Sequence, residues 1–220
     1  MSAKAAKNPQ EPLSISKGRL EAFSDGVFAI AITLLVLELR PPEAVSNDAA
    51  LIAALGALWP EYLVYFASFA TIGIMWFNHS ALFHNARAVT YTALVANLAL
   101  LLGVCFLPFT TLLLGRVGLL PSATAFYGLT LLAISICFNV LWYAAHVPAG
   151  QHGSVLDFVR KRNAWNSIGL IVYAGGTVLA YFSPLASIVL FAAMAIYYLL
   201  PGTVRSALAA SADGEGSGTD

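Results

Sequence analysis

Four side chains that can carry charge or exchange hydrogen bonds, Arg19, Glu21, Ser24 and Asp25, stand at the start of a long apolar segment. Residues 19–39 read RLEAFSDGVFAIAITLLVLEL, and about 20 helical residues of this kind are enough to cross the hydrocarbon layer of a bilayer. Asp25 lies about two turns inside that helix. A carboxylate in this position is costly, so we expect it to have a partner and a role.

The same segment has two different faces when it is wound as an α-helix at about 100° per residue. The bulky apolar side chains fall in one narrow arc, which contains Phe23, Ile30, Leu34 and Leu37, with Val27 and Thr33 on its flank. Ser24 and Asp25 project about 120–140° away from that arc. We call Ile30, Leu34 and Leu37 the aliphatic ladder. On a lone membrane helix such a face contacts lipid or packs against another helix.

The end of the second apolar segment offers partners for Asp25. A buried carboxylate can accept hydrogen bonds from an indole, an amide or an imidazole N–H, and these bonds offset the cost of desolvation. We therefore predict a polar network between the two helices, formed by Arg19, Ser24, Asp25, Trp76, Asn78 and His79. The alternative is a carboxylate that carries protons or binds an ion, although Asp25 points away from the ladder.

The composition is that of an integral membrane protein. Of the 220 residues, 59% are hydrophobic and 10% are charged, and the mean hydropathy is +0.78, whereas about 25% of residues are charged in soluble domains. The formal net charge is zero, so nothing points to a nucleic-acid partner. Cys105 and Cys137 are expected to be packing thiols, and His84 and His146 ordinary helix-end residues, so we predict no metal site and no cofactor.

The apolar segments predict six transmembrane helices within a single domain over residues 17–202. They lie at about 19–39, 60–82, 88–114, 122–145, 165–181 and 185–200, and a short helix is expected at 51–58. Pro108 should kink the third of them. Residues 1–16 and 203–220 read as disordered tails. Asn97, Asn139 and Asn166 are expected to form hydrogen bonds between helices.

The basic residues predict the orientation. With six helices both termini share one side, and that side holds nine of the 11 Lys and Arg residues: Lys4, Lys7, Lys17, Arg19, Arg87, Arg160, Lys161, Arg162 and Arg205. Only Arg40 and Arg116 fall on the other side. Because short cytoplasmic loops are enriched in basic residues, both termini are expected to be cytoplasmic.

Two motifs resemble those of the transmembrane protein 175 family of potassium channels. Arg19 followed by Phe23-Ser24-Asp25 matches R-x-x-x-F-S-D in the first helix. Ser68-Phe69 followed by 76–79, WFNH, is similar to S-F and W-x-N-H in the second. The resemblance covers about residues 17–202.

The resemblance implies an all-α integral membrane protein that forms a homotetramer with the first helix lining a central pore. It implies potassium ions as the transported species, a hydrophobic constriction at Ile30, Leu34 and Leu37 with Ile30 narrowest, and a structural lock around the F-S-D motif. It also implies a lock lysine in the third helix, which this chain lacks. Thr33 could meet a passing ion or bond back to the Ala29 carbonyl, and the second is the safer expectation.

The chain is thus predicted to be a potassium-selective channel of a bacterial-type plasma membrane. It contains no TVGYG filter, Walker motif, G-x-S-x-G or H-E-x-x-H, and no nucleophile–base pair can be assembled, so we do not expect an enzyme. The alternative function is a proton-coupled secondary transporter in which Asp25 and His79 carry protons. A non-conducting scaffold is the third reading, if the ladder serves only for packing.

Overall fold

The computed structural model describes residues 16–43, 45–86, 90–146 and 164–199, and this part of the chain is helical throughout apart from its connections. Its elements are α1 (Lys17–Leu34), the 3-10 helix η1 (Leu35–Glu38), α2 (Asp48–Ala57), α3 (Trp59–Asn85), α4 (Tyr91–Val117), α5 (Pro121–His146), α7 (Ala164–Leu179) and α8 (Pro184–Leu199). Residues 1–15 and 203–220, predicted to be tails, and Arg87 and Arg160–Arg162 of the predicted basic loops lie outside the described residues.

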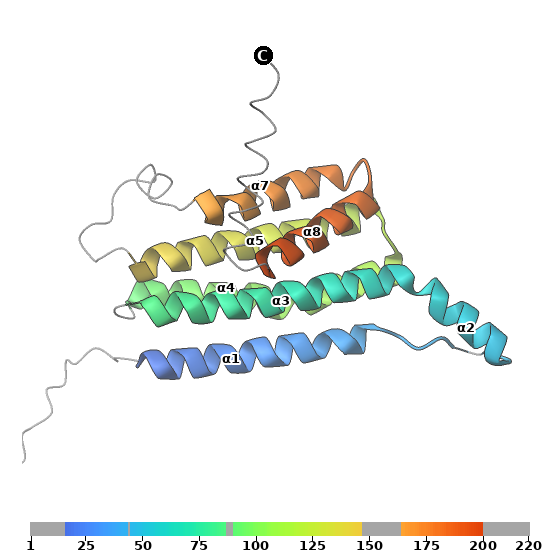
Figure 1. Cartoon of the computed structure of the whole chain (residues 1–220), viewed down its shortest axis with the longest axis horizontal. Coiled ribbons are helices and arrows are strands. Elements are labelled where there is room, and N and C mark those ends of the chain that lie inside the picture. The colour runs from blue at the N-terminus through green and yellow to red at the C-terminus, as the bar shows by residue number, and fades with distance from the viewer. Residues whose placement is uncertain (1–15, 44, 87–89, 147–163, 200–220) are drawn as a thin grey trace, which may run out of the picture.

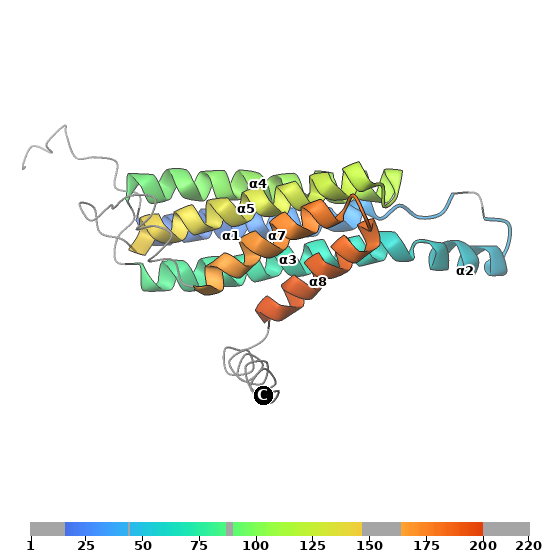
Figure 2. The ribbon, with the colours of Figure 1, turned by 90° about the horizontal axis from the view of Figure 1, so that it is seen from above.

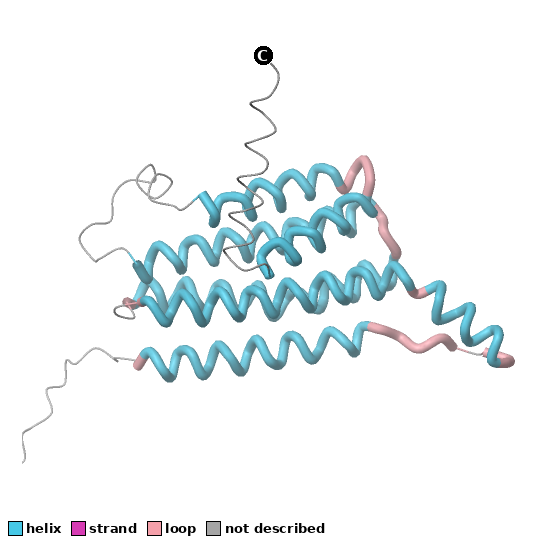
Figure 3. Tube along the Cα trace, viewed as in Figure 1, coloured by secondary structure: helices cyan, strands magenta, loops and turns pink. Residues whose placement is uncertain are grey.

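The helices lie side by side, with α1 along one edge of the bundle (Figure 1). α1 packs on α3 and α4, α5 joins α4 to α7, and α8 packs on α3 and α7. The view from above separates α3 from α4, which overlap in the first view (Figure 2). The described loops gather at the two ends of the bundle, and α2 projects beyond one of them (Figure 3). One face of α1 is therefore covered by the bundle and the opposite face is not.

Local sequence signals account for the helix boundaries. Asn47 caps α2, because its Oδ1 accepts a hydrogen bond from the Ala50 backbone N–H at 2.9 Å. Thr90 caps α4 in the same way, with 3.1 Å from the Ala93 N to its Oγ1. Gly118 ends α4 with a φ of 74°, in the left-handed region that suits glycine. α1 becomes a 3-10 helix at Leu35, and this helix ends at Glu38, before Pro41-Pro42, where a helix could not continue.

The seven described α-helices are the six predicted long segments together with the predicted short helix, α2. By length and apolar composition, three of them can cross a membrane: α1 with η1, α4 and α5. α2 and α3 meet at a bend of 51° and could supply a fourth span as a pair, whereas α7 and α8 are apolar but shorter. The predicted count of six spanning helices therefore goes beyond what the described helices establish.

A chain of buried hydroxyl groups joins α3, α4 and α5. Ser68 Oγ lies 2.8 Å from Thr111 Oγ1 and 2.9 Å from Tyr127 Oη, and Thr111 Oγ1 donates to the Leu107 carbonyl at 3.0 Å. Since the Thr111 hydroxyl already donates its only hydrogen to this carbonyl, Ser68 must donate to Thr111 and Tyr127 must donate to Ser68. Ser68, the serine of the S-F motif, is thus a packing and hydrogen-bonding residue of the core.

Phe191 on α8 fits into a notch made by two glycines. A Cβ added at Gly128 on α5 would lie 2.9 Å from its Cζ, and a Cβ added at Gly176 on α7 would overlap its ring. Phe191 is 1% exposed, so its ring has no free space into which it can retreat. The absence of a side chain at these two positions lets α5, α7 and α8 approach closely.

Gly176→Ala should therefore lower the thermal midpoint of the purified protein by several degrees. Overpacking typically costs about 1–3 kcal/mol, which exceeds the gain of roughly 1 kcal/mol in helix propensity. The matched control is Gly175→Ala, because a Cβ added at Gly175 meets nothing within 4 Å, and its midpoint should stay level or rise. Differential scanning fluorimetry in detergent measures both midpoints. Equal midpoints for Gly176→Ala and Gly175→Ala would contradict the close fit of Phe191 between the two glycines.

Candidate functional site: the two faces of α1

α1 buries one stripe of side chains against its neighbours. The buried positions are Leu20, Ser24, Phe28 and Ala31, continued by Leu35 in η1. Their spacing of three or four residues places them on one helical face, and this face contacts α3 and α4. The stripe positions the polar groups of α1, because it fixes which way every other residue of the helix points.

A buried chain of hydrogen bonds crosses this interface. His79 Nε2 of α3 lies 2.7 Å from Asn97 Oδ1 of α4, and Asn97 Nδ2 donates to Ser24 Oγ of α1 at 3.0 Å. Ser24 Oγ in turn donates to the Leu20 carbonyl at 2.9 Å. Ser24, His79 and Asn97 are each at most 1% exposed. We call these three residues, with the Leu20 carbonyl, the His79–Ser24 chain.

The direction of this chain is fixed by its last member. Ser24 has one hydroxyl hydrogen, which goes to the Leu20 carbonyl, so its oxygen can only accept from Asn97. The Asn97 amide must then turn its NH₂ to Ser24 and its oxygen to His79, which makes His79 Nε2 a donor. The rings of Phe28 and Phe83, with centroids at 5.4 and 4.8 Å, hold the imidazole between them.

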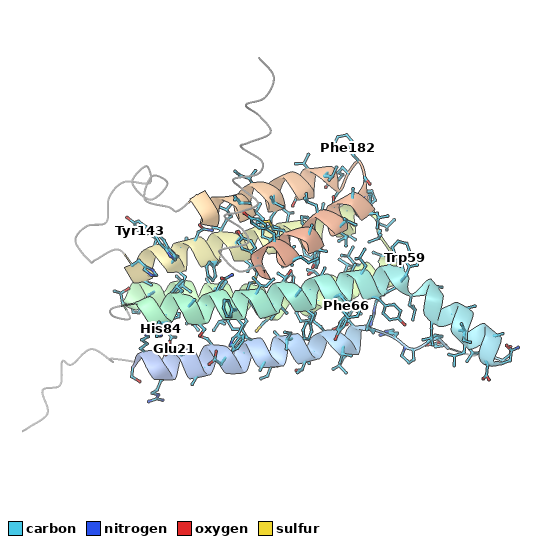
Figure 4. The ribbon with its side chains drawn as sticks, viewed as in Figure 1. Glu21, Trp59, Phe66, His84, Tyr143 and Phe182 are labelled. Carbon is cyan, nitrogen blue, oxygen red and sulfur yellow. The ribbon has the colours of Figure 1, made fainter. Side chains whose placement is uncertain are left out.

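Asp25 belongs to a separate, exposed pair. Trp76 Nε1 donates to Asp25 Oδ1 at 2.8 Å, and both residues are exposed on the surface of the subunit. At the same end of the bundle, Lys17 Nζ donates to the His84 carbonyl at 3.2 Å. Figure 4 shows Glu21 of α1 and His84 of α3 at this end. Two hydrogen bonds on the surface therefore join the start of α1 to α3, and the buried His79–Ser24 chain joins it to both α3 and α4.

The predicted network is divided by the structure. Ser24 and His79 enter the buried chain, and Asp25 and Trp76 form the exposed pair. Arg19 and Phe23 are exposed and belong to neither group. Asn78 was expected in the network, but it lines a cavity on another face of α3, with Thr71 and Asn139. Asn78 points away from His79 because adjacent helical residues are about 100° apart, and its place in the network stays a prediction.

Asn97 is the member that sequence reasoning did not place in the network. The sequence predicts a hydrogen bond from Asn97 to another helix, and Asn97 makes two, to α1 and to α3. The signal in the sequence is an amide in an otherwise apolar segment. The two partners of Asn97 lie 18 and 73 positions away along the chain, and nothing in the sequence identifies them. α4 contains no lysine, and Asn97 supplies the polar contact from this helix.

The aliphatic ladder lies on the uncovered face of α1. Ile30 is 62% exposed, Leu34 42% and Leu37 70%, so a large part of each side chain lies on the surface of the subunit. Thr33 is also exposed, and its Oγ1 donates to the Ile30 carbonyl at 2.9 Å. The backbone bond expected for Thr33 is present, but its acceptor is Ile30 and not the predicted Ala29. A row of exposed aliphatic side chains on a membrane helix must meet lipid, another subunit or a pore.

Among the residues that the structure describes, no group of three or more His, Cys, Asp and Glu side chains is arranged to hold a metal ion. The face of α1 carries aliphatic groups and one hydroxyl that is already bonded to the backbone. The ladder is therefore an apolar surface that excludes water.

Asn97→Leu should destabilise the folded protein by about 1–3 kcal/mol, because it leaves the His79 N–H and the Ser24 oxygen buried without partners. A double-mutant cycle with Ser24→Ala tests the chain itself, through thermal or denaturant unfolding of all four forms in detergent. If the two residues act together, Ser24→Ala should cost less in the Asn97→Leu background than in the wild type. Strictly additive losses would show that they do not share one chain.

This chain is similar in sequence to several known membrane channels. The family model described as "Endosomal/lysosomal potassium channel TMEM175" matches residues 19–108, which run from the first turn of α1 through α2 and α3 to two thirds of the way along α4. A potassium channel of Chamaesiphon minutus is 43% identical over 137 residues, which are 60% of this chain and 68% of that protein. The endosomal/lysosomal proton channel TMEM175 of Mus musculus is 45% identical over 111 residues, but these are only 22% of its length.

Two further matches extend over most of the chain. A potassium channel of Streptomyces collinus is 36% identical over 208 residues, which cover 88% of this chain and 98% of that protein. The crystal structure of a lysosomal potassium-selective channel TMEM175 homolog from Chamaesiphon minutus superimposes with a TM-score of 0.72 at 36% identity, over 83% of this chain and 96% of the other. With both sequence and fold shared along nearly the whole length, the chain belongs to the TMEM175 family.

Proposed function

We propose that this chain is a subunit of a potassium-selective cation channel. The observation that carries the proposal is the division of α1 into two faces: one is held on α3 and α4 by the His79–Ser24 chain, and the other presents Ile30, Leu34 and Leu37 uncovered. A rigidly held helix with an uncovered aliphatic face is suited to line a pore. Bacterial relatives named as potassium channels, at 34–43% identity, support potassium as the ion.

One helix cannot enclose a pore, so several copies must surround an axis. We propose a homotetramer with cyclic symmetry, in which the aliphatic ladders of the four α1 helices face the axis. Ile30 then forms the narrowest ring, with Leu34 and Leu37 beyond it. Such rings exclude water when they close, and the cost of removing water from an ion as it passes sets the preference for potassium over sodium.

The subunit is proposed to be a multi-pass protein of a bacterial-type plasma membrane with both termini in the cytoplasm. Lys17 and Arg19 start α1 at one end of the bundle, whereas Arg40 and Arg116 lie beyond η1 and at the end of α4. The side with more basic residues is the cytoplasmic one. Ser24, Asp25, Trp76 and His79 then lie in the cytoplasmic half of the membrane, acting as structural groups that hold α1.

Proton-coupled transport is the alternative. It would require Asp25 and His79 to load and release protons, and TMEM175 relatives in animals are named proton channels. In this structure Asp25 is bonded to Trp76, and His79 is bonded to Asn97. These separate bonds favour two structural roles over a shared proton path.

Flux through liposomes tests the proposed pore. The wild type should pass potassium rapidly, without saturation and in preference to sodium, and Ile30→Asn should raise sodium flux severalfold because it places a polar amide in the constriction. The control is Ile171→Asn on α7, since Ile171 is 70% exposed on a helix remote from α1 in the fold. It should leave the ratio of potassium to sodium flux unchanged.

Two results would overturn the pore assignment. Equal effects of the two asparagine variants would mean that Ile30 has no special place in the conduction path. Slow flux that follows a proton gradient and does not respond to Ile30→Asn would establish the transporter alternative.

Asp25→Ala should weaken assembly more than selectivity. The substitution leaves the Trp76 N–H without its acceptor, and this group becomes costly once a neighbouring subunit covers the exposed pair. Size-exclusion chromatography with light scattering should show a smaller tetramer fraction, whereas the tetramers that remain should keep the wild-type ratio of potassium to sodium flux. Intact tetramers with altered ion preference would instead place Asp25 in the ion path.

A further inference from the structure

The cavity that Asn78 lines lies away from α1, between α3, α5, α7 and α8. Its volume is about 260 Å³, and its lining comes from all four helices. It extends from Thr71, which is buried on α3, to His146, which is exposed in the last turn of α5. Because an apolar cavity of roughly 150 Å³ takes up benzene, this one has room for a bicyclic ring system.

The lining defines the chemistry of an occupant. It contains no Asp, Glu, Lys or Arg residue, and its one imidazole, that of His146, lies at the exposed end, so a charged molecule in the inner part would have no counter-ion. Aromatic side chains contribute from three elements: Phe138 and Trp142 on α5, Tyr173 on α7 and Tyr198 on α8. The Trp142 and His146 rings already stack at 4.9 Å near the exposed end. Such walls favour a flat, neutral, aromatic ring.

Asn139 adds a hydrogen-bonding requirement. It lines the cavity and is 4% exposed. The sequence predicts a hydrogen bond from Asn139 to another helix, but its Nδ2 donates at 2.7 Å to the Ser135 carbonyl of its own helix. Its Oδ1 is buried and has no partner among the described residues. A buried acceptor without a partner is costly, and a donor in the cavity that reaches this oxygen would satisfy it.

We propose that this cavity binds a neutral aromatic molecule with one ring N–H or O–H donor, of the size of indole or a phenol, and that Asn139 Oδ1 accepts the donor. The aromatic side chains enclose the ring, and the uncharged lining excludes its acidic and basic derivatives. The site lies across α3 from the His79–Ser24 chain and does not depend on the proposed conduction function.

Binding of radiolabelled indole to the full-length protein in detergent, with the uptake of empty micelles subtracted, tests the proposal. Uptake should saturate at one indole per subunit. Indene has the same shape without the N–H, so it should compete about fivefold to tenfold less well. Indole-2-carboxylate, the anion, and tryptamine, the cation, should compete weakly. Equal competition by indene, or by either charged analogue, would overturn the proposal.

Two variants assign the site within the protein. Ala195→Leu fills the cavity from α8, where Ala195 is 2% exposed, and should abolish saturable binding. Asn139→Leu removes the acceptor at similar volume, and it should raise thermal stability while reducing indole affinity about tenfold. Val140→Leu, on an exposed position beside Asn139, is the control and should bind as the wild type does. Wild-type binding by a folded Asn139→Leu or Ala195→Leu protein would place the indole elsewhere.

Discussion

The arrangement of this subunit depends on how the start of α1 is held to its neighbours. Among the described long helices α1 packs mainly on α3 and α4, and its buried stripe alone would allow small rotations and slides, because apolar contacts are not directional. The hydrogen bonds from His79 through Asn97 to Ser24 are directional, and they are buried where water cannot replace them. They fix the rotation of α1 and therefore the direction in which Ile30, Leu34 and Leu37 point.

A second chain of buried hydrogen bonds joins α3, α4 and α5. Tyr127, Ser68 and Thr111 form a chain of hydroxyl groups that ends on a backbone carbonyl, as the His79–Ser24 chain does. Each chain joins three helices, and each ends in a hydroxyl whose hydrogen is committed within its own helix. In a membrane, where apolar burial does not drive helices together, such bonds and close contacts like those of Phe191 are what makes one packing better than others.

The sequence could predict the helices and the two faces of α1, because both follow from composition and from the helical period. The sequence could not show which polar residues enter the buried His79–Ser24 chain and which form the exposed pair of Asp25 and Trp76. Ser24 and Asp25 are adjacent in sequence, yet one is fully buried and the other exposed, since a step of about 100° separates them. The choice between these environments depends on where α3 and α4 lie. The place of Asn97 depends on the same tertiary information, which a single sequence does not contain.

The change of winding at Leu35 has a geometric consequence for the end of the ladder. In an α-helix, residues three apart are offset by about 60° around the axis, whereas in a 3-10 helix they are nearly eclipsed. Leu34 ends α1 and Leu37 lies within η1, so Leu37 is brought toward a position directly above Leu34. Each residue of η1 also advances about 2.0 Å along the axis, against about 1.5 Å in an α-helix. Leu34 and Leu37 therefore line up along the helix axis with a rise of about 6 Å between them, where a uniform α-helix would offset them by about 60° and separate them by about 4.5 Å.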